Sequence, residues 1–168
     1  IVVKERRGSG SKKIGIKLEL ADSKAWATSL REPIFQPYLD GPELSAETWI
    51  NRDGKCHGML LRWRKVVING ESHETEVFQD HIVEEKIKSS LELIEGLYGH
   101  CLIQLILPPD QEPAIIEINP RLGGATPLAL HAGIKSISWF LLESQGMGNI
   151  IPTNPTIKYG SKLLKKNG

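Results

Sequence analysis

The residues best suited to carry chemistry lie in the segment Ala114–Gly124, which reads AIIEINPRLGG. An apolar run leads there into Glu117 and Asn119, which are two residues apart. On a β-strand, side chains at that spacing share one face and lie roughly 7 Å apart along the backbone. A carboxylate beside an amide oxygen suits a hard divalent cation such as Mg²⁺, and Arg121 adds a fixed positive charge next to it. A buried strand that ends in a polar turn would give the same pattern, so the spacing alone leaves both interpretations open.

A second candidate is the basic, glycine-rich segment that follows Lys4. Its small residues are Gly8, Ser9, Gly10 and Ser11. Such residues allow backbone N–H groups to converge on an anion, and the surrounding cations would raise the affinity for phosphate. The segment lacks the Gly-Lys-Ser/Thr ending of a P-loop, and an apolar alternation follows it rather than a helix. A glycine-rich hairpin over phosphates and a solvated basic loop both fit, the second at least as well as the first.

The segment Gln36–Glu43 could bind a nucleotide base through its backbone. Pro37 has a carbonyl group but no N–H, and Leu39, after Tyr38, offers an N–H two residues later. In an extended chain, that acceptor and donor could pair with the amino edge of adenine. Glu43 could accept hydrogen bonds from ribose hydroxyls. Taken in isolation, the segment is better explained as a surface strand that leads into a turn.

Gln104 is the one polar residue in the apolar run Cys101–Leu107. A buried amide needs hydrogen-bond partners, because leaving it unpaired costs on the order of 1–3 kcal/mol. The turn residues 108–113 separate this run from the strand at 114–119, which predicts a hairpin with Gln104 beside Glu117. Gln104 could therefore bind a metal through its oxygen or satisfy a neighbouring side chain.

A less specific cationic group consists of Arg62, Arg64 and Lys65, with His73 in the following loop. A solvated charged strand explains these residues better than a binding site. The other histidines lack metal-ligand spacing, and the four tryptophans are scattered, which favours core or interface packing over a stacking platform for bases. No Ser-His-Asp or Cys-His arrangement is apparent.

Length and composition exclude several classes of protein. The chain has 168 residues, enough for one or two small domains, and its 21 Lys and Arg nearly balance its 20 Asp and Glu. No strong field therefore argues for nucleic acid or an anionic membrane, and the apolar runs are too short to span a bilayer. Cys56 and Cys101 are expected to be reduced, with Cys101 in the core, and the expected location is the cytoplasm. Because the chain starts with Ile1 directly in a β-type run, we expect further sequence upstream.

Local patterns predict the elements that must position these residues. Strands are expected at 1–4, 14–20, 34–39, 43–51, 56–67, 101–107 and 114–119. Helices are expected at 23–30 after an Asp22 cap, at 81–97 after an Asp80 cap, and from Thr126 to about 144. Residues 71–79 are polar enough to be a mobile loop. Strands that meet by hairpins and turns, with helices between them, predict an α+β fold with antiparallel sheets.

Taken in order, these elements resemble the ATP-grasp superfamily, and most closely its carbamoyl-phosphate-synthase-like branch and related carboxylate–amine ligases. The resemblance runs over nearly the whole chain. The matching features are Val3-Lys4 with the loop 8–11, the segment 36–43, Gln104, the motif 117–121, Gly124 and the helix 127–133. It implies an ATP-grasp fold in which two α+β subdomains with antiparallel sheets clamp a nucleotide. Residues 1–39 would be part of the nucleotide-lid subdomain, and residues 40–168 the C-terminal subdomain with the metal site.

The resemblance also implies a role for each candidate residue. Lys4 would contact the ATP phosphates, residues 8–13 would close over them, and the segment 36–43 would hold adenine and ribose. Gln104, Glu117 and Asn119 would ligate one or two Mg²⁺ (or Mn²⁺) ions, and Arg121 would stabilise the transferred phosphoryl group. Glu5 stands where the family often has proline, and Pro37 replaces a usual charged residue; neither departure excludes binding.

The implied activity is that of an ATP- and Mg²⁺-dependent ligase. A carboxylate attacks the γ-phosphate to give an acyl phosphate, and an amine or ammonia then displaces phosphate. The expected partners are these small molecules and an upstream domain or subunit that completes the cleft, with no nucleic acid and no membrane. A non-catalytic nucleotide-binding module and an incomplete fragment of a larger ligase are the alternatives. The full set of Lys4, Gln104, Glu117, Asn119 and Arg121 favours catalysis over loss of the chemistry.

Overall fold

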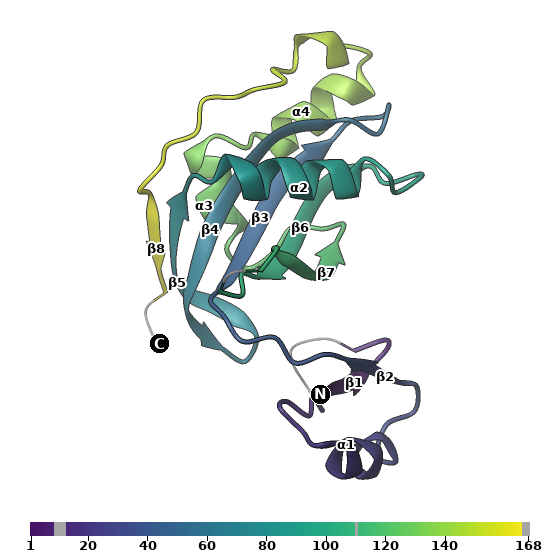
Figure 1. Cartoon of the computed structure of the whole chain (residues 1–168). Coiled ribbons are helices and arrows are strands. Elements are labelled where there is room, and N and C mark those ends of the chain that lie inside the picture. The colour runs from purple at the N-terminus through teal and green to yellow at the C-terminus, as the bar shows by residue number, and fades with distance from the viewer. Residues whose placement is uncertain (9–12, 110, 166–168) are drawn as a thin grey trace.

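The computed structural model describes residues 1–8, 13–109 and 111–165, and these residues form two antiparallel sheets (Figure 1). The smaller sheet pairs β1 with β2, and the larger one has the strand order β7-β6-β3-β4-β5-β8. The strands are β1 (Val2–Glu5), β2 (Pro33–Gln36), β3 (Glu43–Ile50), β4 (Cys56–Ile68), β5 (Glu71–Phe78), β6 (Gly99–Ile106), β7 (Ala114–Asn119) and β8 (Lys162–Leu164). The helices are α1 (Leu20–Ala27), α2 (His81–Leu91), α3 (Thr126–Ala132) and α4 (Ser136–Ser144), with a short 3₁₀ turn η1 (Gly148–Ile150). The predicted α+β class with antiparallel sheets is confirmed.

The smaller sheet differs from the sequence prediction between its two strands. The strand expected at 14–20 is wrong, because Gly15 makes only an isolated bridge with Val3. Lys13 and Lys17 have φ angles of 54° and 57°, which interrupt an extended strand. The helix α1 starts at Leu20 rather than after an Asp22 cap, so Asp22 lies within its first turn.

The hairpin of β3 and β4 has the predicted position. Asn51 closes its turn by accepting hydrogen bonds on Oδ1 from the backbone N–H groups of Asp53 (3.0 Å) and Lys55 (2.7 Å). The mobile loop expected at 71–79 is wrong, because this segment forms β5 and pairs with β4. Asn69 and Gly70 have positive φ angles, which make the tight turn that returns the chain along β4.

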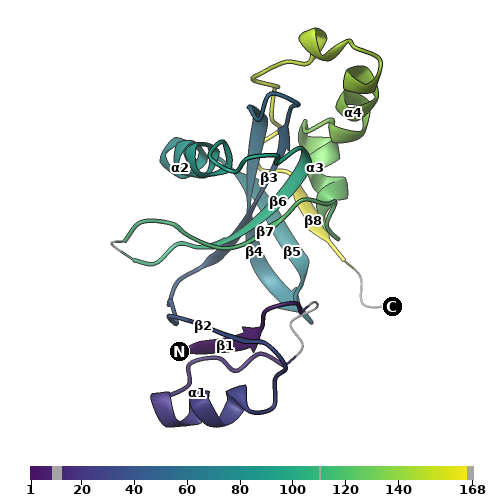
Figure 2. The ribbon, with the colours of Figure 1, turned by 90° about the vertical axis from the view of Figure 1, so that its right-hand side faces the viewer.

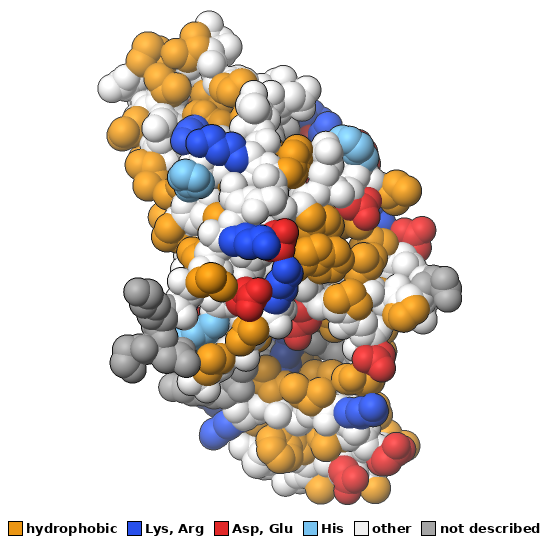
Figure 3. All heavy atoms as spheres, turned by 90° about the vertical axis from the view of Figure 1, so that its left-hand side faces the viewer, with side chains coloured by type: hydrophobic (Ala, Val, Ile, Leu, Met, Phe, Trp, Pro, Cys, Tyr) orange, Lys and Arg blue, Asp and Glu red, His pale blue; other side chains and the backbone are white. Residues whose placement is uncertain are grey.

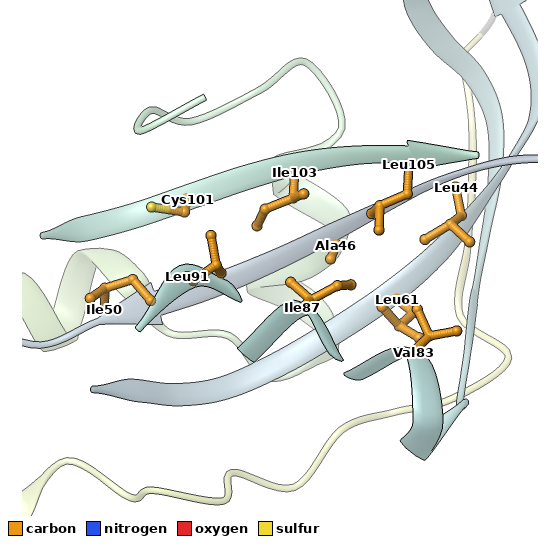
Figure 4. Close-up of a cluster of buried hydrophobic side chains, with 10 residues drawn as sticks. All are labelled: Leu44, Ala46, Ile50, Leu61, Val83, Ile87, Leu91, Cys101, Ile103 and Leu105. Atoms are coloured by element: carbon orange, nitrogen blue, oxygen red, sulfur yellow. The ribbon is translucent and has the colours of Figure 1, made fainter. Parts of the chain in front are cut away.

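The helix α2 covers one face of the larger sheet. Its predicted cap is confirmed, since the Asp80 carboxylate accepts from the N–H groups of Ile82 and Val83, both at 3.1 Å. The helix ends at Leu91, six residues earlier than expected from the apolar pattern. Figure 4 shows its buried side chains packed on the sheet, and the cluster comprises Leu44, Ala46, Ile50, Leu61, Val83, Ile87, Leu91, Cys101, Ile103 and Leu105. Cys101 is a buried core residue, as predicted, and both cysteines are free.

The helices α3 and α4 cover the opposite face of the sheet (Figure 2). The single helix expected from Thr126 to about 144 is wrong, because the chain breaks at Gly133 with a φ of +138°. A Cβ at this position would lie 2.3 Å from the carbonyl oxygen of Thr156, so the break needs glycine. Within the described ranges, no helix combines the length and apolar character required to cross a membrane.

Candidate functional site

A cavity of about 590 Å³ lies between the two sheets. Lys4 and Gln36 line it from the smaller sheet, and Arg62, Gln104 and Glu117 line it from the larger one. Figure 3 shows a hollow between the larger part of the molecule and the smaller part below it, with charged side chains at its edge. The cavity therefore brings predicted site residues of the smaller sheet close to those of the larger sheet.

Seven of the residues predicted to act together line this cavity. They are Lys4, Gly8, Gln36, Gln104, Glu117, Asn119 and Arg121. The lining does not include the segment 37–39 or Glu43. Tyr38 lies beneath Lys17, whose Nζ is 5.4 Å from the ring centroid, and Glu43 accepts a hydrogen bond of 3.0 Å from Arg64. Ser9, Gly10 and Ser11 fall outside the described residues.

A row of polar residues crosses four strands beneath the cavity, and its members Glu117, Gln104 and Arg62 line the cavity, whereas Ser45 is fully buried. The predicted hairpin of β6 and β7 places Gln104 directly opposite Glu117. On the other side, Gln104 is opposite Ser45, and Ser45 is opposite Arg62. Residues opposite each other in an antiparallel sheet point to the same face. The row therefore runs from a carboxylate, through an amide and a hydroxyl, to a guanidinium.

The residues at the carboxylate end of this row fit a divalent cation. Asn119 lies on the same face as Glu117, and its buried side-chain nitrogen has no partner among the described residues, so its amide is free to turn its oxygen toward a ligand. With Gln104, these residues offer oxygen donors of the kind that Mg²⁺ prefers. The described part of the chain has no cluster of three or more His, Cys, Asp or Glu residues suited to a metal. A cation held here would therefore take most of its anionic ligands from phosphate groups.

The loop after β7 keeps the backbone close to this part of the sheet. Arg121 turns back immediately, since its N–H donates to the carbonyl oxygen of Asn119 at 2.8 Å. A Cβ on Gly123 would lie 2.5 Å from Leu102 Cδ2, so glycine allows the loop to lie against the sheet. The Gly123 N–H then donates to the Thr126 hydroxyl at 2.7 Å, where α3 begins.

The charges around the cavity favour an anionic ligand. The cations that line it are Lys4, Arg6, Arg62, Arg64 and Arg121, and the carboxylates are Glu5, Glu71 and Glu117. Hydrogen bonds from the backbone of Glu32 and Arg31 lower the pKa of Glu5, and Lys165 lowers the pKa of Glu71 at a distance of 2.8 Å. Glu5 is thus held by backbone hydrogen bonds and Glu71 by an ion pair, whereas Glu117 has neither within the part of the chain that the structure describes.

Sequence reasoning missed a buried network behind this wall. The predicted solvated strand is wrong for Arg62, whose side chain is 2 % exposed and donates from Nε to Glu47 Oε1 at 2.9 Å. His100 Nε2 lies 3.2 Å from the second Glu47 oxygen, and His100 Nδ1 lies 2.6 Å from the Ser136 hydroxyl. Burial would raise the pKa of Glu47, but the His100 hydrogen bond and the Arg62 charge outweigh it and lower that pKa. One signal in the sequence could have indicated this network: polar residues alternate at 43, 45 and 47 of a predicted strand, which lies opposite Arg62 in the same hairpin.

Comparisons with known proteins agree with this architecture. A family model described as an ATP-grasp domain matches residues 1–125. No curated protein matches the chain.

Several solved structures share the fold at low sequence identity. Biotin carboxylase from Campylobacter jejuni, solved as a β-γ-ATP complex, is similar over 96% of this chain and 40% of its own, with a TM-score of 0.73 and 14% identity. The biotin carboxylase domain of 2-oxoglutarate carboxylase from Hydrogenobacter thermophilus, in complex with MgADP, ADP and bicarbonate, has a TM-score of 0.68 at 12% identity over 96% of this chain and 39% of its own. L-amino acid ligase from Bacillus licheniformis has a TM-score of 0.58 at 16% identity over 93% of this chain and 39% of its own. The chain spans about 40% of the length of these proteins.

Proposed function

The chain belongs to the ATP-grasp domain family, and we propose that it is an ATP- and Mg²⁺-dependent ligase that activates a carboxylate as an acyl phosphate for attack by an amine or ammonia. The observation that carries this proposal is the Gln104–Glu117 pair, which faces a cavity lined by cations from both sheets. The names of the similar structures support the reaction class, since they include two biotin carboxylases with bound nucleotides and an L-amino acid ligase.

The nucleotide would lie between the two sheets. In this proposal, Lys4 contacts the phosphates, Gly8 with Ser9, Gly10 and Ser11 closes over them, and Gln36 lies at the edge of the nucleotide. The Pro37 carbonyl and the Leu39 N–H bind adenine on either side of Tyr38, and Glu43 accepts from the ribose while it keeps its ion pair with Arg64. Residues 37–39 and Glu43 are not part of the cavity lining, so the adenine and ribose contacts rest on the resemblance to ATP-grasp proteins.

Gln104, Glu117 and Asn119 would hold Mg²⁺ or Mn²⁺ at the phosphates. When bound, the cation would neutralise phosphate charge. Since Glu117 is the only carboxylate of the three, cation binding should be weak without nucleotide and strong with it.

Phosphoryl transfer requires mainly that a protein positions its reactants and neutralises the spreading negative charge. The acid's carboxylate oxygen attacks the γ-phosphorus, and the bond to the β-γ bridging oxygen breaks to release ADP. The nitrogen of the amine then attacks the acyl carbon, and phosphate leaves with the electrons of the C–O bond. Arg121 and Lys4 supply positive charge to these steps, and the closing loop excludes water from the acyl phosphate.

Titration calorimetry followed by an ADP-release assay tests this proposal. The wild-type chain should bind MgADP and MgATP, and one member of a panel of small carboxylic acids with ammonia should trigger ADP release. Absence of nucleotide binding would overturn the proposal for this chain. Binding without acid-dependent ADP release would instead identify a nucleotide-binding module without ligase chemistry.

A further inference from the structure

We propose that Arg62, at the end of the polar row opposite to Glu117, binds an anionic oxygen of a ligand in the cavity. Glu47 and His100 position the Arg62 guanidinium for this contact. The inference rests on the proposed function, because it places this oxyanion beside the bound nucleotide. It assigns a further anion-binding residue to the cavity, in addition to Lys4 and Arg121.

Arg62 combines burial with access to the cavity. Arg62 is only 2 % exposed, yet it lines the cavity wall. Nε donates to Glu47, and Nη1 lies 3.1 Å from the Ser72 hydroxyl and 3.4 Å from the Thr75 hydroxyl. Nη2 makes no hydrogen bond with any residue that the structure describes. One edge of the guanidinium is therefore fixed by the protein, and the other keeps donors for a ligand.

Glu47 and His100 hold this arrangement from behind. Glu47 is fully buried, and its second oxygen lies 3.2 Å from His100 Nε2. His100 is in turn fixed by Ser136 at the start of α4. A buried ion pair is weak evidence for stability, because apolar residues of similar volume often replace one without loss. Its position against the cavity wall is better explained by the need to aim Arg62.

The place of Arg62 in the polar row identifies what it would contact. Two strand spacings separate Arg62 from Gln104, or about 10 Å between their backbones. Between them lies Ser45, which is fully buried beneath the cavity lining and whose hydroxyl has no partner among the described residues. An oxyanion between Gln104 and Arg62 would lie next to the metal-bound phosphates. The guanidinium fork suits both the terminal phosphate of ATP and the carboxylate of the acid, and these share the same oxyanion chemistry.

Two titrations separate these sources. The first compares the affinities of the wild-type chain and Arg62→Lys for MgADP and for Mg²⁺ with the non-hydrolysable analogue AMPPNP. The second titrates inorganic phosphate into each protein saturated with MgADP. Arg62→Lys keeps the charge but lacks the fork, so the affected affinity should fall about tenfold while MgADP affinity changes less than about twofold. Lys65→Met is the matched control, since Lys65 is also on β4 and paired with a glutamate, Glu76, but does not line the cavity.

Each result has a defined meaning. Loss of affinity for AMPPNP, with or without loss for phosphate, assigns the oxyanion to the terminal phosphate. Loss for phosphate with unchanged AMPPNP affinity assigns it to an anion position beyond that phosphate, where the acid's carboxylate would bind. Unchanged affinities in both titrations would overturn the inference while leaving the proposed function intact. A wild-type chain that does not bind MgADP would overturn the proposed function and this inference together.

The positioning role of Glu47 needs a separate readout. Glu47→Gln preserves the shape of the side chain but removes its charge, so it should weaken the same affinity as Arg62→Lys while leaving MgADP affinity unchanged. The double variant should lose little more than either single variant, because both act through one guanidinium. Additive losses, or a loss of thermal stability with no change in these affinities, would show that Glu47 has only a structural role.

Discussion

Gln104 and Glu117 lie directly opposite each other on β6 and β7, although 12 residues separate them in the sequence. The pairing continues to Ile103 and Ile118 on one side and is interrupted by a register shift after Gln104 on the other. The amide and the carboxylate thus share one face at the end of a regular ladder. Because only one of the two carries charge, the site depends strongly on Glu117.

Replacing Glu117 by glutamine should abolish most Mg²⁺-dependent nucleotide binding. The substitution keeps the size of the side chain and one oxygen but removes the negative charge that a divalent cation requires. We expect affinity for MgADP to fall by more than about tenfold in calorimetry. The melting temperature should stay within about 2 °C of wild type, since Glu117 is exposed on an edge strand.

Glu112→Gln is the control for this experiment. Glu112 is also an exposed glutamate in the β6–β7 connection, but it pairs with Lys86 on α2 and does not line the cavity. Its substitution should leave MgADP affinity unchanged. Equal affinities for Glu117→Gln and wild type would remove Glu117 from the candidate metal site.

Lys4→Ala should weaken nucleotide binding more than it changes stability. Lys4 lines the cavity from β1, and the proposed function assigns its ammonium group to the ATP phosphates. Loss of one charge-assisted contact should lower the affinity for MgATP about tenfold and reduce its dependence on salt. Lys24→Ala removes an exposed lysine of α1 and should change neither property. The assigned role fails if both variants bind MgATP as wild type does.

The sequence predicted the part of the site that depends on short-range pairing. The turn at 108–113 fixes which residues of β6 and β7 are opposite each other, so the Gln104–Glu117 contact could be expected from spacing. The Asp80 cap and the 51–55 turn were predictable for the same reason, because each depends on hydrogen bonds between residues close in sequence.

Features that depend on distant residues could not be predicted in this way. Residues 71–78 are polar, but β4 supplies their backbone partners and buries Ser72 and Thr75. Gly133 breaks the helix expected from Thr126 to about 144. The break depends on Thr156, which is 23 residues further along the chain and packs against Gly133. Arg62 resembled a solvated residue because its other partners, Ser72 and Thr75, lie on β5, which was expected to be a loop.

Glu92 should make stability depend on pH. The backbone N–H of Cys56 donates to its carboxylate at 3.0 Å, and Lys55 lies 3.2 Å away. The Cys56 hydrogen bond lowers the pKa of Glu92, with a further lowering by Lys55 against the opposing effect of burial. A lowered pKa means that this stabilisation is present above the ordinary carboxyl pKa and is lost as the pH falls through the folded-state value.

Glu92→Gln measures that contribution. Near pH 7 the variant should melt about 2–4 °C below wild type, and the difference should shrink as the pH falls toward about 3. Glu95→Gln is the control, since Glu95 is an exposed glutamate three residues further along with no ion pair among the described residues. A difference for Glu92→Gln that stays constant across this range would contradict the charge-dependent role.

Neither cysteine should react readily with a thiol reagent in the folded protein. Cys101 is fully buried, and burial raises its pKa to about 11. Burial also raises the pKa of Cys56, whose Sγ lies 2.8 Å from the Thr48 hydroxyl. Since the thiolate is the reactive form, Ellman's reagent near pH 8 should label the native protein slowly and label two thiols once concentrated guanidinium chloride unfolds it. Any residual native labelling should persist in Cys101→Ala, which assigns it to Cys56; rapid labelling that disappears in this variant would show that the cluster beneath α2 opens in solution.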